Sequence, residues 1–313
     1  MSEEKVIEKK KRICETIDDI IARTDKNVLE NNTLLRRLKK EFLYPDAAAA
    51  LGEYNTEAIE AARHAAVARK VAWVVETDQP KVRFPRFVKG YPVKREPGQT
   101  STIAAGSKIT YVDVDVDIEA YAEQVVDRVT VEDTPASILR RLGPQLVEDV
   151  YYQETSDLIA VLDTISSSNL AGGAAQSPSS AGAFQYVDFL TLLSALEGEG
   201  WNPGIRKTLL FNPAQFYDKL ASDDKFINSN YQTATLDPET GALGRIFNTQ
   251  FIPTGAVTAG TVYLLTWFAV GMPLRRDATI ETFEEKNGVT VYASSRYGMK
   301  VLVTKAVAKM TGA

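Results

Sequence analysis

Three carboxylates alternate with valines in one stretch of the chain, KITYVDVDVDIEAY. Aspartates two residues apart open the EF-hand loop, which binds calcium through carboxylate oxygens. That loop also needs a glycine at its sixth position and a glutamate at its twelfth, and counting from Asp113 these positions hold Ile118 and Gln124. The alternation predicts a half-buried strand instead, with Asp113, Asp115 and Asp117 on its wet face and no bound metal. An acidic face of this kind could meet a basic partner.

The chain offers few other groups for catalysis or metal binding. It has one histidine, His64, in an alanine-rich helical stretch, and one cysteine, Cys14, so it has no internal disulfide. These counts exclude histidine-rich zinc sites and Cys–His catalysis, and no glycine-rich phosphate-binding loop is present. Carboxylate pairs that are distant in sequence stay open, yet nothing favours an enzyme. We therefore predict no catalytic residue, no cofactor and no metal.

Composition sets the class of protein. The 313 residues are 44% hydrophobic and 25% charged, which is typical of a folded soluble protein with one elaborate domain or two. The net charge of −5 argues against a polycation that binds nucleic acid along its whole length. No apolar run reaches the length of a membrane span, and the start, MSEEKVIEKKKR, is not followed by the apolar core of a signal peptide. A reducing cytoplasm suits the single cysteine.

The first segment, residues 3–40, is charged and carries isoleucines and leucines at helical spacing. Two interpretations stay open for it. It could be a solvated amphipathic helix on its own domain, or an arm that embraces a neighbouring subunit or faces a polyanion. A helix over about 56–70 and a strand over 71–77 follow.

Residues 78–111 form an extended segment broken by four prolines and three glycines. Prolines place an extended chain at a sheet edge, and a segment of this length is too long for a routine connection, so we expect a projecting functional loop. Nucleic-acid contact is one interpretation, and contact with the acidic face of a neighbouring subunit is the favoured one. The basic residues expected to make that contact are Arg83, Arg86, Lys89, Lys94 and Arg95.

The longest helical pattern runs over 134–165, a rod of about 45 Å, with apolar residues at spacings of four and eight. Gly143 and Pro144 lie in its interior, and proline removes a backbone donor, so the pair predicts a bend. A flexible Gly/Ser/Ala loop is expected over 166–182.

The remaining part reads as mixed helices and strands. A helix over 184–200, a strand over 205–212 and a short helix are followed by several strands. Two of the strands are expected to form a hairpin joined at Asn287 and Gly288, which is the strongest short turn signal. A last continuous strand is expected over 299–310.

Three stretches, taken with the order of these parts, resemble a known family. They are LLFNPAQFYDKL (209–220), TGALGRIFNTQFIPTGAVTAGTVYLL (240–265) and FEEKNGVTVYASSRYGMKVLVTKAVAKM (283–310). In this order they resemble the major capsid proteins of tailed double-stranded DNA viruses, which have the α+β HK-ninety-seven-like fold shared with encapsulin shells. The resemblance covers roughly residues 40–313.

The resemblance implies a division of the chain. It gives an N-terminal helical arm (1–70) and an extended loop (78–111). A peripheral domain with the spine helix takes 71–77, 112–165 and 276–296, and an axial domain takes 166–275 and 297–313.

It further implies a structural subunit that self-assembles through hexamers and pentamers into an icosahedral shell around double-stranded DNA. The shell would be located in the virion and assembled in the host cytoplasm, without membrane contact. Packaged DNA would be held weakly and without sequence preference, with the basic stretch 5–12 as the inward-facing candidate, and portal, scaffold or decoration proteins are further partners. The alternatives are an encapsulin-like compartment shell and, less favoured, an unrelated α/β enzyme.

One branch of the family links a lysine of the loop covalently to an asparagine of the hairpin, helped by a glutamate. Asn287 matches that asparagine, and Lys89, Lys94 or Lys108 could supply the lysine. Ser294 stands at the position of the glutamate. Because a lysine must be deprotonated to attack, we expect no such link here.

Overall fold

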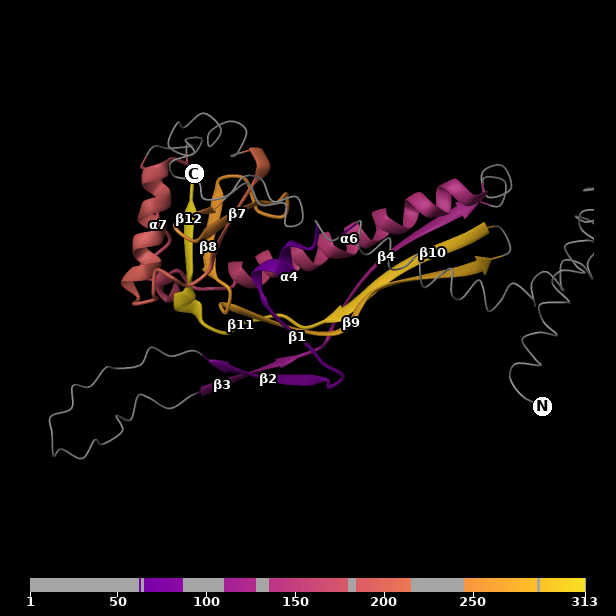
Figure 1. Cartoon of the computed structure of the whole chain (residues 1–313), viewed down its shortest axis with the longest axis horizontal. Coiled ribbons are helices and arrows are strands. Elements are labelled where there is room, and N and C mark those ends of the chain that lie inside the picture. The colour runs from indigo at the N-terminus through magenta and orange to yellow at the C-terminus, as the bar shows by residue number, and fades with distance from the viewer. Residues whose placement is uncertain are drawn as a thin grey trace, which may run out of the picture. The chain divides into compact units, whose positions relative to one another are not determined.

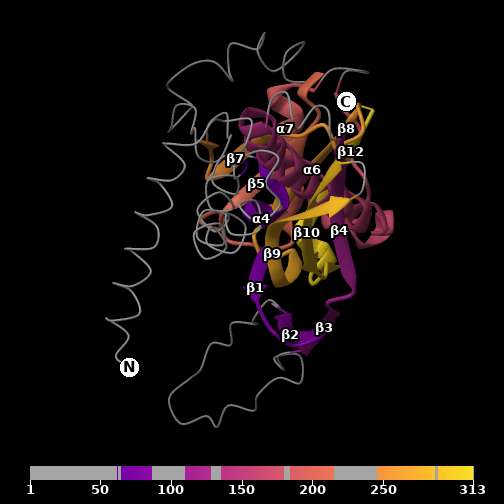
Figure 2. The same ribbon diagram turned by 90° about the vertical axis from the view of Figure 1, so that its right-hand side faces the viewer.

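A computed structural model describes residues 62, 65–86, 110–127, 135–179, 184–214, 245–285 and 288–312. Residues 1–57 lie outside these ranges. Within the described ranges the chain forms three β-sheets with two long helices, α6 and α7 (Figures 1 and 2). No helix in these ranges is long and apolar enough to span a membrane.

The first sheet has the strand order β1-β9-β10-β4. Its strands are β1 (Trp73–Glu76), β9 (Val270–Glu285), β10 (Gly288–Tyr297), β4 (Ile118–Asp127) and the short β11 (Lys300–Val301), which pairs with β9. β1 runs parallel to β9, whereas the other pairs are antiparallel. The predicted hairpin is β9–β10. Gly288, which was expected in the turn, is the first residue of β10 and pairs with Glu285, and Asn287 lies outside the described ranges.

Helix α6 (Pro135–Asp163) lies along this sheet beside β4 and β10 (Figure 1). The predicted apolar stripe is buried, including Leu146, Val150 and Leu158. The helix continues across Gly143 and Pro144, so the proline lies inside it. A bend at this pair stays a prediction.

The second sheet has the strand order β12-β8-β5-β7-β6. Its strands are β12 (Val307–Thr311), β8 (Thr261–Thr266), β5 (Lys207–Phe211), β7 (Thr249–Pro253) and β6 (Arg245–Ile246). Helix α7 (Tyr186–Gly198) covers one face and packs closest to β12 and β8. A capping box between Gln185 and Asp188 starts this helix.

Short connections link the two large sheets at two points, residues 267–269 between β8 and β9 and residues 302–306 between β11 and β12. The predicted limits of the axial domain were residues 275 and 297. Both lie within strands of the first sheet, because β9 already pairs with β1 at Gly271 and β10 ends at Tyr297. The predicted last strand is wrong as one continuous element. The short helix η6 (Thr304–Ala306) separates β11 from β12, and each pairs in a different sheet.

The predicted loop over 166–182 is also more regular than expected. It contains the two short helices η3 (Ser167–Asn169) and η4 (Ala171–Gly173). The Gln176 backbone then bonds to β12, donating to the Lys309 carbonyl at 2.8 Å and accepting from the Thr311 N–H at 3.1 Å. The described part of this Gly/Ser/Ala segment is therefore a largely exposed connection that is hydrogen-bonded to β12.

The third sheet is a two-stranded ladder of β2 (Lys81–Arg86) and β3 (Thr110–Asp115). The predicted acidic strand is thus divided. β3 ends at Asp115, Asp117 lies in the connection, and β4 begins at Ile118. The division follows from pairing, since β3 pairs with β2 whereas β4 pairs with β10.

Candidate inter-subunit surfaces

The β2–β3 ladder brings the predicted basic and acidic residues together within one chain. Arg83 Nε donates to Asp113 Oδ1 at 2.9 Å, and Lys81 Nζ lies 3.5 Å from Asp115 Oδ1. Both pairs are directly opposite in the antiparallel register. The hydrogen bond and charge of Arg83 outweigh desolvation and lower the pKa of Asp113. The acidic face therefore already has basic partners in its own chain.

One of the other predicted basic residues lies in the ladder. Arg86 closes the ladder opposite Thr110, whereas Lys89, Lys94 and Arg95 lie outside the described ranges. Their contact with a neighbouring subunit stays a prediction.

The opposite face of the ladder is apolar and packs on the body of the molecule. Phe84 and Val114 are buried there. The Phe84 ring meets Trp73 of β1 edge-on at a centroid distance of 5.3 Å, and Trp73 meets Trp267 at 5.5 Å. The path continues through Phe268 to Trp201, with centroid distances of 5.5 and 5.0 Å. An aromatic path thus ties the ladder to the segment where the chain changes sheets.

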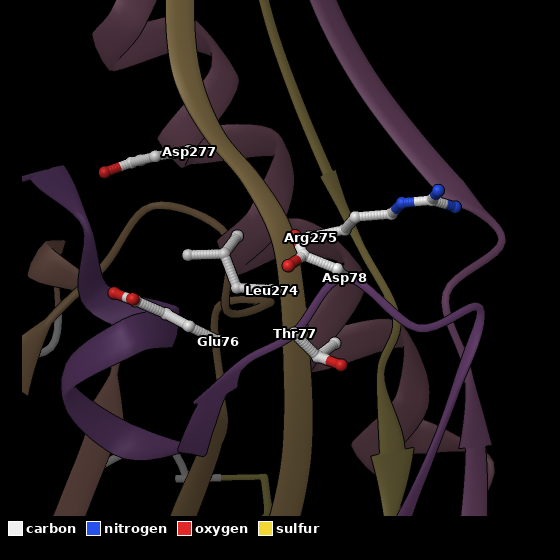
Figure 3. A pocket seen from close by; sticks show the side chains of 6 residues that line it. All are labelled: Glu76, Thr77, Asp78, Leu274, Arg275 and Asp277. Carbon is white, nitrogen blue, oxygen red and sulfur yellow. The ribbon is translucent and has the colours of Figure 1, made fainter.

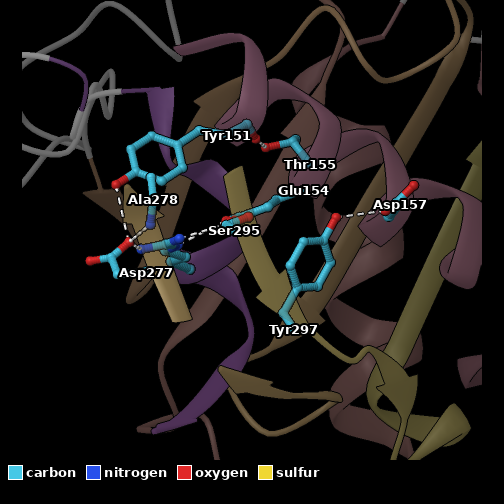
Figure 4. Close-up of polar contacts among 9 residues, drawn as sticks. Tyr151, Glu154, Thr155, Asp157, Asp277, Ala278, Ser295 and Tyr297 are labelled. Carbon is cyan, nitrogen blue, oxygen red and sulfur yellow. Dashed lines mark hydrogen bonds and ion pairs between the residues drawn. The ribbon is translucent and has the colours of Figure 1, made fainter. Parts of the chain in front are cut away.

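A buried polar network joins α4 (Val67–Val71), α6 and the first sheet. Arg69 makes a bidentate ion pair with Glu154, with Nε–Oε2 and Nη2–Oε1 distances of 2.8 and 2.7 Å. The Ser295 hydroxyl donates to Glu154 Oε1 at 2.9 Å, and Arg69 also pairs with Asp277 (Figure 4). The guanidinium carbon lies 4.4 Å from the centroid of the Tyr151 ring.

The protonation states in this network suit a structural role. Burial disfavours the charged form of Arg69, but the hydrogen bond and charge of Glu154 outweigh it and raise the pKa of Arg69. Burial also raises the pKa of Tyr297, whose hydroxyl donates to Asp157 Oδ2 at 2.6 Å. The arginine stays charged and holds α4 on α6, whereas the tyrosine stays neutral and holds β10 on α6.

A second polar joint fixes the last turn of α6 to the second sheet. Asp163 accepts hydrogen bonds from Tyr263 of β8 and from Lys309 Nζ of β12, the latter at 2.6 Å. Burial works against the carboxylate, but these two hydrogen bonds outweigh it and lower the pKa of Asp163. The long helix is therefore attached to both large sheets.

An open cavity of about 350 Å³ lies where β1 meets β9, lined by Glu76, Thr77, Asp78, Leu274, Arg275 and Asp277. Glu76 and Asp277 point to one side of β9, whereas the Arg275 guanidinium points to the other (Figure 3). The charged groups do not converge on a common point, so the cavity lacks the arrangement that acid–base catalysis requires.

The face of the first sheet turned away from α6 carries exposed apolar side chains between the carboxylates Glu123 and Glu281. Tyr121, Val125 and Phe283 are exposed there, and Tyr121 stacks on Tyr292 at a centroid distance of 5.9 Å. Exposed apolar groups gathered on one sheet face are typical of a protein–protein contact.

Several of these residues were not predicted from the sequence. Glu154 stands in the gap of eight between Val150 and Leu158, so the interrupted apolar stripe was the signal for a buried charge. The tryptophans of the aromatic path are far apart in sequence and carried no signal of their proximity.

No protein-family model and no curated protein sequence matches the chain. Solved structures do match. The capsid of the cyanophage P-SCSP1u is 13% identical, with a TM-score of 0.55 over 78% of this chain and 86% of that chain. A virus-like particle from Pyrococcus furiosus is 12% identical, with a TM-score of 0.56 over 83% and 99% of the two chains. The capsid of an empty GTA particle is 16% identical, with a TM-score of 0.55 over 80% and 90%.

These matches establish the fold. The chain has the α+β HK-ninety-seven-like fold, and the expectation drawn from the order of its segments is confirmed at this level.

Proposed function

We propose that the chain is a major capsid protein, a structural subunit that self-assembles into a closed icosahedral shell enclosing double-stranded DNA. The observation that carries the proposal is the match of the fold over most of the chain to structures described as capsids or as a virus-like particle. The match also covers 86%, 99% and 90% of the three similar chains.

The surfaces of the chain support this function. Shell assembly needs complementary contact faces and no catalytic cluster. The exposed apolar side chains Tyr121, Val125 and Phe283 give one such face. The β2–β3 ladder is anchored to the body of the subunit through Phe84, and residues 87–109, which join its two strands, would supply a second contact face.

The partners follow from this role. Other copies of the chain, arranged as hexamers and pentamers, are the main partner. Packaged DNA would be bound weakly, without sequence preference and with strong salt dependence, since the net charge of −5 opposes tight binding to a polyanion. Portal, scaffold and decoration proteins would be further partners, in a virion capsid assembled in the host cytoplasm.

Electron microscopy of the purified chain tests the proposal. Closed shells of one or a few discrete sizes are expected, and shells that hold nuclease-resistant DNA after expression with the viral genome would support the capsid function. Small shells that hold host proteins instead of DNA would favour an encapsulin-like compartment. Soluble monomers or small oligomers under all assembly conditions would overturn a shell function.

A further inference from the structure

The outer face of α7 is unusual for a surface helix. Its exposed residues follow one stripe at helical spacing and carry no charge: Val187, Leu190, Thr191, Ser194 and Gly198. Val187 is 52% exposed and Leu190 is 37% exposed. The opposite side, with Phe189 and Leu192, lies in the core of the second sheet. A surface helix normally turns charged groups to water, whereas the two acidic residues of α7 do not join this stripe: Asp188 is buried and Glu197 is ion-paired with the buried Lys207.

A second feature lies at the edge strand β6. Ile246 pairs with Thr249, so Phe247 and Asn248 form a two-residue turn, with φ values of 50° and 57°. Asparagine and glycine are favoured in such turns, whereas a bulky residue at positive φ is a true outlier. Phe247 is also 53% exposed. Local preference therefore opposes phenylalanine at this tip, and strained positions of this kind cluster at functional sites.

The turn that holds Phe247 is fixed from below. Asn248 donates from Nδ2 to the Gly204 carbonyl at 2.8 Å, and the Asn248 carbonyl accepts from the Lys207 N–H at 3.2 Å. Lys207 is itself buried and ion-paired with Glu197 of α7 at 2.9 Å. An aromatic side chain is thus held out on a supported tip rather than on a loose loop.

The two features lie toward opposite edges of the second sheet. β6 is the last strand on one side, whereas α7 packs closest to β12, the last strand on the other, and Figure 1 shows α7 beyond β12 as seen from β7. A projecting apolar group and an apolar surface at opposite edges of one subunit make a head-to-tail contact, and such contacts generate rings when the rotation closes.

We propose that Phe247 of one copy packs on the α7 stripe of the next copy, around the ring of a capsomer. The occupant of the stripe is a second copy of this chain, because the chain itself supplies the matching aromatic tip and the stripe has no charge that would select a polar ligand. The inference rests on the proposed shell function and identifies two surfaces through which a ring would form.

Cysteine crosslinking tests the contact directly. Cys14→Ala removes the one native thiol, and Phe247→Cys and Leu190→Cys are then introduced separately and together. Mixing the two single variants should give disulfide-linked dimers under mild oxidation, and the double variant should give a ladder that ends at the ring. Leu190→Cys combined with Glu281→Cys, at an exposed position of the first sheet, is the matched control and should give no ladder.

A second variant separates the contact from folding. Phe247→Asn places a residue that tolerates positive φ in the turn, so the subunit should unfold at the same or a higher temperature while shells are lost. Two results would contradict the contact but not the shell function. One is that Phe247→Asn forms normal shells. The other is that the native chain forms shells but the double-cysteine variant does not crosslink. A native chain that forms no shells at all would contradict both.

Discussion

Gly298 is the residue at which the chain after β10 comes closest to the end of β3. A Cβ atom at this position would lie 1.9 Å from the Asp115 carbonyl oxygen, which belongs to the backbone and cannot swing aside. Gly298→Ala should therefore force the ladder away from the first sheet and lower the free energy of unfolding by about 1–3 kcal/mol. Urea unfolding followed by tryptophan fluorescence measures the loss.

Gly198 provides the control for this prediction. It is the last residue of α7, and a Cβ atom there would meet nothing within 4 Å. Gly198→Ala should be neutral or stabilise the chain by about 0.4–1 kcal/mol, because alanine restricts the unfolded chain. Equal effects of the two substitutions would show that close approach at Gly298 is not the constraint.

Asp163 makes the joint between α6 and the second sheet sensitive to acid. Its pKa is lowered in the folded chain, so its contribution to stability is present above the unfolded pKa of about 3.9 and is lost as pH falls through the folded value. Because the side chain is 47% exposed, solvent screening limits the contribution to about 1 kcal/mol or less. Melting temperatures of the native chain and Asp163→Asn should differ at pH 7, and the difference should shrink as the pH falls below about 3.9. A difference that does not change with pH would contradict the ionic contribution.

At the scale of elements, the Arg69–Glu154 pair holds α4 on α6. Glu154 is fully buried, so Arg69→Met leaves a buried carboxylate with the Ser295 hydroxyl as its remaining described donor. The free energy of unfolding should fall by about 3–5 kcal/mol, and adding Glu154→Met should restore most of it, since the buried charge is then gone.

A double-mutant cycle by chemical denaturation measures this coupling. Arg83→Met is the matched control, because the Arg83–Asp113 pair is exposed and its loss should have a much smaller effect. If the double variant at positions 69 and 154 were as unstable as Arg69→Met alone, the network would act through packing rather than through charge.

Elements with strong local periodicity could be predicted from the sequence. Helix α6 lies within one residue or two of its expected bounds, and the hairpin β9–β10 was visible in its turn signal. The division of the acidic strand into β3 and β4 was not predicted. The alternation of apolar and acidic residues indicates which side chains are exposed, but it does not indicate which strand is the pairing partner. The split between β11 and β12 has the same cause, since neighbouring residues pair in different sheets.

The candidate contacts show the same limit. The charges of the extended loop were evident, but the pairing of Arg83 with Asp113 depends on a register that only the folded ladder fixes. Phe247 carried no signal in the sequence, because its positive φ is a property of the turn that the pairing of β6 with β7 imposes.

At the scale of the whole molecule, the ladder and the loop beyond it should be separable. The ladder belongs to the folded body, because Phe84 packs on Trp73 and Lys300 Nζ donates to the Asp113 carbonyl at 3.2 Å. Arg86 pairs with Thr110, so residues 87–109 can be replaced by Asn-Gly, a two-residue connection suited to an antiparallel pair. The shortened subunit should unfold at the same temperature as the native chain, since the described contacts are all retained.

Assembly is where the two chains should differ. If residues 87–109 contact a neighbouring subunit, the shortened chain should form subunits or rings but no closed shells, as judged by electron microscopy and sedimentation. In a control variant, residues 87–109 are replaced by a Gly/Ser segment of equal length, which keeps the length of the loop but not its side chains. This variant should also form no closed shells, because it lacks Lys89, Lys94 and Arg95. Closed shells from the Asn-Gly variant would show that residues 87–109 are not needed for assembly. Shells from the Gly/Ser variant alone would assign the loop a spacing role without charge recognition.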